Sequence, residues 1–520
     1  MEKGKIPEPL ERPTRDSYDL VVVGAGVAGL NALHAATVHL PSGAHVLLVD
    51  EKDRPGGMWT VAYDYVRLHQ PHPLFTVGGM RWDWAKPANY LARRDEVQAH
   101  LASCLQAMRG VCALDTCFGQ RAGDVREVRQ SDGWAAEVDL HPIGAPEDGV
   151  TVSARRVIHA AGFNYSAPGP LQLSSAQVVS TTPADLHGAL AQNPDAPAYV
   201  VGGGKTGMDT VLAILDENPE RRTVLINGGG TYYLNRDRAF PRGLRRWFSG
   251  KIIADMARDC AMIFDGHNEE VLRRHYIDTY ATACDPRSRN HVWGILSDEE
   301  NARIDAGLSD KVWDYLDDVI DGPDGPLMRL RSGDVKPIAA GSIIVSCTGS
   351  VFHSNAVAHR PACLSPNDVI LSITPRDTMH VLSTYASFIL SHLFFTGALR
   401  RAGLYFMDLE ALYTVQKPVF AATTMAQSYH NLLVGFGNLP PRLLRHFGID
   451  FNRWHPLPRR LLALNRLRKT AQQDVVHCRA ALDTVVARFG IDGGVMDVAK
   501  MCSTSHKTPD TSHRQEEDVT

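Results

Sequence analysis

YDLVVVGAGVAGLNALHAATVHL, residues 18–40, is the stretch that decides the fold. Its first six residues form an apolar, largely β-branched run that is typical of a buried parallel strand. GAGVAG, residues 24–29, follows at once and leads into a sequence of helical character. A second apolar run, Val46–Val49, ends at Asp50, which lies 21 residues after Gly29. This order of strand, glycine loop, helix, strand and acid predicts a unit that binds a dinucleotide.

The glycines of this first loop have separate tasks. Gly24 permits a tight turn, Gly26 lets a pyrophosphate approach the backbone, and Gly29 allows the helix to pack closely on the strand. The start of the helix offers amide groups and a partial positive charge to the phosphates. Asp50 is placed to accept hydrogen bonds from ribose hydroxyls. The full context favours this role over a purely structural glycine turn.

A second loop of the same kind is GGGKTG at residues 202–207, between the apolar run Ala198–Val201 and a helical sequence. The next apolar run ends at Asn227 rather than at an acid. A carboxylate there would repel a 2′-phosphate, so its absence favours NADP over NAD. The basic residues near this loop and strand are candidate phosphate ligands, with solvated surface charges as the alternative: Lys205, Arg221, Arg222, Arg236 and Arg238.

Two similar strand ends flank the second loop, RVIHAAG at residues 156–162 and IIVSCTG at residues 343–349. Small residues at such ends let the backbone pass close to a cofactor. Their placement predicts an α/β fold of two Rossmann-like domains, the second inserted into the first. The expected division is a polar leader (1–17), a first domain (18–181 and 341–440), a second domain with a helical insert (182–340), a C-terminal helical extension (441–502) and a disordered tail (503–520).

The chain resembles the class B flavin-dependent monooxygenases, which comprise flavin-containing, N-hydroxylating and Baeyer–Villiger enzymes. VVVGAGVAGL, residues 21–30, is similar to their FAD loop, and Gly56-Gly57-Met58-Trp59 to their GG-x-W turn over the flavin. GKTGMD, residues 204–209, resembles the G-N-S-G-x-D of the flavin-containing branch, with Lys205 in place of asparagine. The AAG and CTG strand ends are similar to the two ATG-like phrases of the family.

This resemblance implies that the first domain binds FAD and the second binds NADPH. On the FAD side, the candidate cofactor-binding residues are Gly24, Gly26, Gly29, Asp50, Glu51, Gly57, Met58, Trp59, His69, Gln70 and Gly162. On the NADPH side, they are Gly202, Gly204, Lys205, Thr206, Gly207, Arg236, Arg238, Thr348 and Gly349.

The resemblance also implies a reaction: NADPH reduces FAD, reduced flavin takes up O₂ as a C4a-hydroperoxide, and a small-molecule substrate receives one oxygen atom. The F-x-G-x-x-x-H-x-x-x-[WY] fingerprint is missing between Gly162 and Gly202. Arg236, Arg238, Arg242, Arg245 and Arg246 form a basic cluster that could clamp a carboxylate, or could be a solvated helix face. N-hydroxylation of an amine or amino acid is therefore favoured. S-oxygenation or Baeyer–Villiger oxidation, and an NAD(P)H-dependent flavin reductase of non-disulfide type, are the alternatives.

The segment RLHQPHP, residues 67–73, corresponds to the place where the family keeps polar side chains near the flavin. His69 and Gln70 are the candidate catalytic residues, because both can donate a hydrogen bond to flavin or to a peroxide. The alternative is a structural loop whose histidines bond backbone carbonyls. No nearby set of Cys, Asp or Glu completes a metal site around His69 and His72, so no metal is expected.

The composition of the chain limits the classes of partner that it is expected to bind and the compartment in which it is expected. The chain has 54 Lys+Arg against 58 Asp+Glu and a net charge of −4, which gives no basic excess for nucleic acid. Nine scattered cysteines without a CxxC pair, and a polar N-terminus unlike a secretory signal, fit a cytoplasmic protein. The apolar stretch Val381–Leu399 is expected to be a buried or docked helix rather than a membrane span. The sequence leaves open whether the chain forms a homo-oligomer.

The stretch 441–470 is basic and holds Asp450 as its single acid. An exposed helical surface is the expected interpretation, and a peripheral membrane or partner contact is the alternative. Membrane contact is therefore not expected from the sequence.

Overall fold

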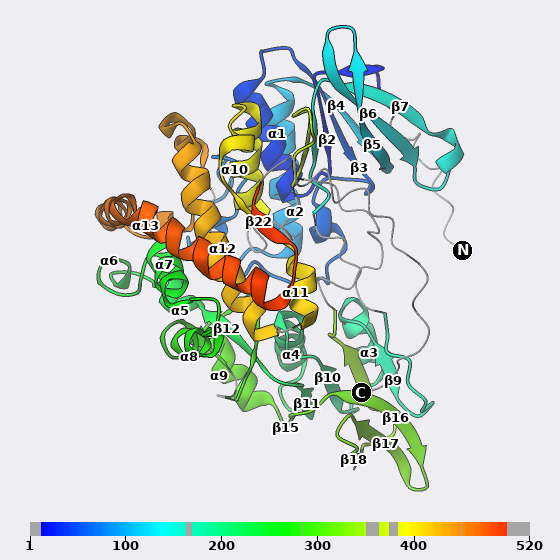
Figure 1. Ribbon diagram of the computed structural model, residues 1–520. Helices are drawn as coiled ribbons and strands as arrows, with labels where there is room; N and C mark the ends of the chain where they lie inside the picture. The colour runs from blue at the N-terminus through cyan, green and yellow to red at the C-terminus, as the bar shows by residue number, and fades with distance from the viewer. Residues whose placement is uncertain are drawn as a thin grey trace.

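The computed structural model describes residues 12–162, 169–283, 285, 287–349, 363–373, 383–415, 417–448 and 450–496. Two five-stranded parallel sheets form the two ends of the molecule, and a layer of helices runs along one side of both (Figure 1). This arrangement confirms the predicted α/β fold with two Rossmann-like units.

The first sheet has the strand order β20-β8-β2-β3-β4. Every neighbouring pair in it is parallel. Its strands are β2 (Leu20–Val23), β3 (His45–Asp50), β4 (Ala113–Phe118), β8 (Val157–His159) and β20 (Ile370–Ser372). Three helices belong to this unit: α1 (Val27–His39), α2 (Arg94–Arg109) and α10 (Ser383–Phe395). The chain thus leaves this sheet after β8 and returns to it at β20.

The second sheet has the strand order β15-β11-β10-β19-β9 and is also parallel throughout. Its strands are β9 (Val179–Thr181), β10 (Ala198–Val201), β11 (Thr223–Ile226), β15 (Asp310–Val312) and β19 (Ile343–Ser346). Its helices are α3 (Leu186–Gln192), α4 (Lys205–Glu217) and α9 (Asp298–Gly307). The sheet therefore extends past both predicted boundaries, 182 and 340, because β9 and β19 pair with each other at its edge.

Four small sheets decorate these units. A β-meander with an added first strand lies on the first unit: β1 (Ser17–Tyr18), β5 (Gln120–Gln130), β6 (Gly133–Pro142) and β7 (Val150–Ala154). The second unit carries β12 (Thr231–Asn235), β13 (Ala281–Thr282) and β14 (Asn290–Leu296), and the hairpin strands β16 (Leu316–Gly322), β17 (Gly325–Leu330) and β18 (Val335–Pro337). The last sheet pairs β21 (Tyr405–Met407) with β22 (Gly493–Val495).

The helical insert of the second unit packs against the C-terminal helices. The insert consists of α5 (Arg236–Ala239), α6 (Arg245–Phe248), α7 (Ile253–Ile263) and α8 (Glu269–Tyr280). The C-terminal helices are α11 (Leu409–Val415), α12 (Lys417–Asn438) and α13 (Leu457–Phe489). Tyr276, Phe420 and Leu482 lie in one buried apolar cluster shared by these helices. The C-terminal region therefore packs on the second unit as well as on the first.

Helix α10 carries most of the apolar stretch Val381–Leu399, and its described side chains are largely buried. Phe388, Ile389 and Leu393 pack in the core of the first unit together with residues of α1. This confirms the prediction of a buried helix. Within the described residues, no helix combines the length and the apolarity needed to cross a membrane.

Two buried histidines at the contact of α1 and α10 predict acid sensitivity. Burial, together with neighbouring histidines, lowers the pKa of His34 to about 4 and that of His392 to about 3. Both rings are neutral in the folded state at pH 5, whereas the unfolded chain would protonate them. Stability is thus lost as the pH falls below 6.5, by about 1.4 kcal/mol per pH unit for each histidine.

Between pH 7 and pH 5, we expect the free energy of unfolding of His34→Gln to fall by about 2 kcal/mol less than that of the parent chain. Urea unfolding at the two pH values measures this difference, and the exposed His267, changed to Gln, is the matched control. An equal loss in the parent and in His34→Gln would contradict the prediction.

Candidate functional site

The first glycine loop is held closely between two strands. Gly24 has a φ of +104°, and a Cβ atom added to it would lie 2.4 Å from the carbonyl oxygen of Ala160 at the end of β8. Its backbone nitrogen donates to the carbonyl of Val49 at 2.7 Å. A Cβ atom on Gly29 would lie 1.7 Å from the carbonyl oxygen of Gly24. Neither position has room for a side chain.

The second glycine loop repeats this geometry. Gly202 has a φ of +117°, and a Cβ atom on it would lie 2.6 Å from the carbonyl oxygen of Cys347, which follows β19. Its nitrogen donates to the carbonyl of Ile226 at 2.9 Å. A Cβ atom on Gly207 would lie 2.0 Å from the carbonyl oxygen of Gly202. The AAG and CTG strand ends therefore play the same part in both units, as closely packed backbone beside the loop.

The remaining glycines and threonines of the predicted sites lie at the same sheet ends. Gly204 precedes α4 and has no other atom within 4 Å of a hypothetical Cβ, which leaves space for a phosphate at the helix start. Thr206 lies in the first turn of α4. Gly162 has a φ of +73°, and Thr348 and Gly349 are exposed after β19.

Asp50 holds the first loop from the end of β3. One carboxylate oxygen accepts from the backbone nitrogen of Ala25 at 2.5 Å, and the other accepts from that of Lys52 at 2.8 Å. Burial raises the pKa of Asp50, although these two hydrogen bonds oppose the shift. The neighbouring Glu51 is exposed and pairs with Lys52 at 2.8 Å. A ribose contact by either acid remains a prediction.

The GGMW turn lies directly against the first loop. Gly56 and Gly57 have φ values of +138° and +54°. A Cβ atom on Gly57 would lie 2.8 Å from the Cα of Gly26. Met58 is exposed, and the Trp59 ring packs edge-on against Phe75 with ring centres 5.9 Å apart. A group bound along the first loop would therefore meet this turn.

The segment after GGMW connects the two units. Tyr63 donates to a carboxylate oxygen of Asp209 at 2.9 Å, and the hydroxyl oxygens of Tyr65 and Thr210 are 2.9 Å apart. Asp209 also forms an ion pair with Lys205, both within α4. Burial raises the pKa values of both tyrosines, so both phenols stay protonated. The flavin side predicted for the first unit thus touches the helix that starts at the second loop.

His69 and Gln70 lie at this junction. Both are partly buried, and neither side chain forms a hydrogen bond with another residue that the structure describes. The backbone carbonyl of His69 accepts from Arg236 at 2.7 Å. Burial and the nearby charges of Lys205 and Arg236 hold the pKa of His69 well below its usual range. The imidazole is therefore neutral at pH 7, and one ring nitrogen can donate while the other accepts.

The basic cluster after β12 does not converge on one site. Arg236 is 6% exposed, and its guanidinium binds Glu300 at 2.5 Å and the carbonyls of His69 and Ile295. Arg238 is exposed and bonds the carbonyl of Asp278 at 3.3 Å. Arg246 lies over the Trp454 ring. The carboxylate clamp considered for these arginines is not formed, because Arg236 is already neutralised by Glu300. A phosphate contact by Arg236 or Arg238 stays a prediction.

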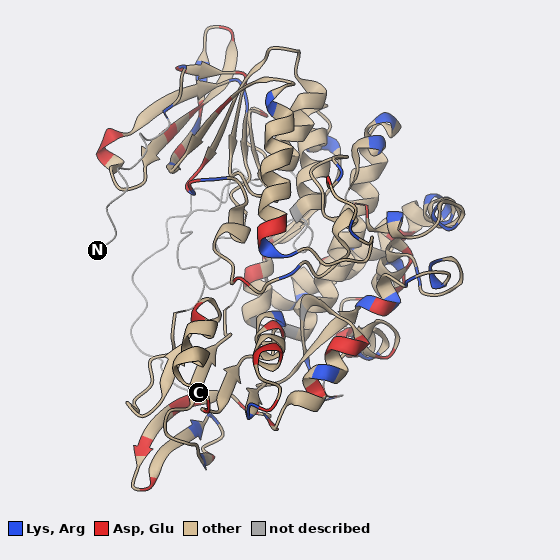
Figure 2. Cartoon of the chain, turned by 180° about the vertical axis from the view of Figure 1, so that it is seen from behind, with Lys and Arg blue, Asp and Glu red and all other residues tan. Residues whose placement is uncertain are grey.

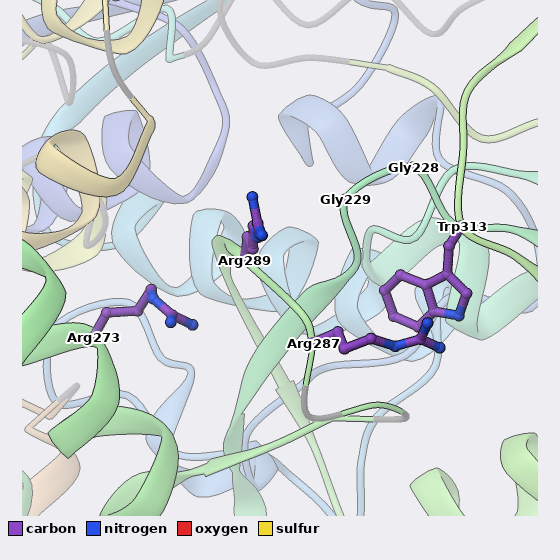
Figure 3. Close-up of a pocket in the computed structure, with 6 residues that line it drawn as sticks. All are labelled: Gly228, Gly229, Arg273, Arg287, Arg289 and Trp313. Carbon is purple, nitrogen blue, oxygen red and sulfur yellow. The ribbon is translucent and has the colours of Figure 1, made fainter. Parts of the chain in front are cut away.

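A cavity of about 410 Å³ lies immediately after β11 and beside the end of β15. It is lined by Gly228, Gly229, Arg273, Arg287, Arg289 and Trp313 (Figure 3). Sequence reasoning missed this site. Its one local signal is the run Gly228–Gly230 after Asn227, whereas the three arginines are more than forty residues further along the chain.

The charges of this cavity suit an anion. Arg287 lies over the Trp313 ring, 4.4 Å from its centre, and binds both carboxylate oxygens of Asp285. Arg273 binds both oxygens of Glu270 at 2.7 Å. Arg289 is exposed and forms no hydrogen bond or ion pair through its side chain with another described residue. Three cations therefore face two carboxylates, which leaves a positive charge for a ligand.

Comparison with known protein families finds a match for the region that contains both glycine loops. The family model of the pyridine nucleotide-disulphide oxidoreductases matches residues 18–229, which contain both glycine loops. This match confirms an oxidoreductase region with two dinucleotide-binding units. Within the described residues, no two cysteines form a disulfide.

An uncharacterized protein of Mycobacterium tuberculosis is 31% identical to the chain over 238 residues, which are 42% of this chain and 41% of that protein. The chain thus spans about two fifths of the length of this relative. An ornithine hydroxylase from Pseudomonas aeruginosa has a solved structure with a TM-score of 0.47 and 12% identity, over 73% of this chain and 99% of that one. A flavin-containing monooxygenase from Stenotrophomonas maltophilia has a solved structure with a TM-score of 0.41 and 18% identity, over 69% of this chain and 90% of that one.

Proposed function

We propose that this chain is an NADPH- and FAD-dependent monooxygenase that inserts one oxygen atom of O₂ into a small-molecule substrate. The observation that carries the proposal is the junction at which Tyr63, Tyr65 and His69 of the first unit meet α4 and Arg236 of the second. It sets the segment beside a flavin against the loop that would hold a nicotinamide coenzyme. Hydride transfer between two cofactors needs such contact between their domains.

Each cofactor has residues that fit it. The first loop and the GGMW turn would hold the FAD pyrophosphate and flavin, since Gly24, Gly26 and Gly57 bring bare backbone together there. The second loop and the open start of α4 at Gly204 would hold the pyrophosphate of NADPH. When bound, these groups supply hydride transfer and oxygen activation. Substrate, O₂, NADPH and one proton then give oxygenated substrate, NADP⁺ and water.

The cavity after β11 supports NADPH as the coenzyme. In a dinucleotide-binding unit, the end of this strand meets the adenosine ribose, and arginine there accommodates a 2′-phosphate. We assign the phosphate to Arg287 and Arg289 and the adenine to the neighbourhood of Trp313. These residues take over the role that the sequence suggested for Arg236 and Arg238.

The protein's own groups would donate hydrogen bonds and hold protons at the junction. His69, neutral at pH 7, and Gln70 can each donate to an oxygen atom in the junction. Tyr63 stays protonated, because burial and Asp209 disfavour its phenolate. Amines and amino acids are the substrates to test first, because the F-x-G-x-x-x-H-x-x-x-[WY] fingerprint is missing between Gly162 and Gly202. Sulfides and ketones are the alternatives.

Stopped-flow spectroscopy of the flavin-loaded protein tests this function. We expect NADPH to reduce the flavin anaerobically, and oxygenated buffer then to produce a transient spectrum that is neither reduced nor oxidised flavin. His69→Ala and Gln70→Ala should shorten its lifetime about tenfold, since a donor hydrogen bond to a reacting oxygen is lost. His267→Ala, at an exposed position, is the control.

Two outcomes decide between the alternatives. Immediate return to oxidised flavin with one H₂O₂ per NADPH would overturn monooxygenation and indicate a flavin reductase or oxidase. A transient that decays faster on addition of an amine, with one hydroxylated product per NADPH, supports N-hydroxylation. The same acceleration by a sulfide or ketone would reassign the substrate class.

A further inference from the structure

An exposed apolar edge lies around α6 and the start of α13. Leu244, Trp247 and Phe248, around α6, are 78%, 49% and 85% exposed. The first two turns of α13 add Leu457, Leu461 and Leu464, each about half exposed or more. We call these six side chains the edge patch. Figure 1 shows α6 and the N-terminal end of α13 together at the left margin of the molecule.

Hydrogen bonds join the two segments that carry the edge patch. Arg459 of α13 donates to the carbonyls of Arg246, Ser249 and Gly250 at 2.7–2.9 Å. Arg246 donates in return to the carbonyl of Trp454 at 2.7 Å. Residues 244–250 are therefore a fixed part of the surface, with their apolar side chains held outward.

The exposed leucines of α13 lie on a helix face that does not pack on the rest of the molecule. Leu457, Leu461 and Leu464 follow the spacing i, i+4, i+7 of one helix face. Ala463, by contrast, is buried, and Arg466 points to Asp255 of α7. An apolar stripe of this kind, turned to solvent, needs an external partner.

Positive charge surrounds the edge patch. There are four basic residues in the range 239–254 and six in the range 451–473, and neither range contains an acidic residue. The whole chain, by contrast, has a net charge of −4. Arg242, Arg245, Arg453, Arg468 and Lys469 are exposed and form no side-chain hydrogen bond or ion pair with another described residue. Figure 2 shows these basic segments at the right margin, the reverse of the view in Figure 1. The partner must therefore be anionic.

We infer that the edge patch binds the surface of an anionic phospholipid membrane, with the apolar side chains among the headgroups and the arginines on lipid phosphates. Interfacial binding combines an amphipathic helix with a basic flank, and tryptophan favours the headgroup level. A second copy of this chain is disfavoured, because a two-fold contact would set the five unpaired cations of one copy near the same five of the other. This inference is independent of the proposed reaction.

Co-sedimentation with vesicles tests the inference on the full, flavin-loaded chain. We expect binding to vesicles of phosphatidylcholine with 30% phosphatidylglycerol and none to phosphatidylcholine alone. Binding should fall as NaCl rises from 0.1 to 0.5 M, since salt screens exposed charges. Arg242→Ala/Arg245→Ala should lower the partition coefficient roughly 30-fold, and Trp247→Ala/Phe248→Ala at least tenfold.

Matched controls remove equal groups elsewhere. Arg222→Ala/Lys336→Ala deletes two exposed charges of the second sheet region, and Trp134→Ala deletes an exposed indole of β6. Both should bind vesicles like the parent chain. Unchanged thermal unfolding and flavin content in the patch variants show that the fold is intact.

Three results would overturn the inference. Absence of binding to anionic vesicles is the first, and equal binding by the patch variants and the parent is the second. The third is an oligomer in sedimentation velocity that Trp247→Ala/Phe248→Ala converts to a monomer without any vesicle binding, which would assign the edge patch to self-association.

Discussion

Gly29→Ala is expected to abolish flavin binding, whereas Gly207→Ala should retain the flavin and lose its reduction by NADPH. The two glycines occupy equivalent positions, and a Cβ atom would lie 1.7 Å and 2.0 Å from a backbone carbonyl oxygen in the respective loops. Backbone cannot yield as a flexible side chain does, so each substitution must separate helix from strand. We expect a local cost of about 3 kcal/mol or more. At least a hundredfold loss in affinity for the affected dinucleotide follows, because its loop is displaced.

Flavin absorbance of the purified variants and single-turnover reduction by NADPH measure these effects. Gly188→Ala is the control, because this glycine of α3 has open space around it and no unusual φ. If Gly29→Ala fails to fold, Gly26→Ala replaces it. Its Cβ would lie 3.4 Å from the Cα of Gly57, so the fold survives while the methyl group opposes the pyrophosphate. Normal reduction of Gly207→Ala by NADPH would contradict the assignment of the second loop.

Arg289→Ala is expected to raise the Kd for NADPH about 30- to 100-fold and to change that for NADH less than twofold. The reason is the loss of charge-assisted hydrogen bonds to the 2′-phosphate, which contribute about 2–3 kcal/mol and which NADH cannot form. Arg287→Ala should add to this effect. It leaves the carboxylate of Asp285 facing the phosphate without its partner.

Rapid reduction by the two coenzymes over a range of concentrations measures both affinities. Arg238→Ala is the matched control, since Arg238 is an exposed arginine of the neighbouring α5. A larger effect of Arg238→Ala than of Arg289→Ala would return the phosphate to the residue that the sequence suggested. Equal losses for NADPH and NADH would remove the cavity from phosphate recognition altogether.

The glycine loops could be found from the sequence because their chemistry is local. Strand, loop and helix follow one another within about 25 residues, and the positions of Gly24, Gly29, Gly202 and Gly207 are dictated by the backbone turn itself. The small strand ends after β8 and β19 were recognised for the same reason. The predicted domain boundaries left β9 and β19 out of the second domain, because their pairing joins residues more than 160 positions apart.

Side-chain roles were decided only by tertiary packing. Arg236 is neutralised by Glu300, and Arg273, Arg287 and Arg289 come together because α8, the segment before β14 and the loop after β11 fold onto one place. The basic runs 236–246 and 441–470 were visible in the sequence, but that they meet at one edge was not. A glycine loop needs only its own neighbours in the chain. A charged pocket or a surface patch needs the whole fold to set distant side chains side by side.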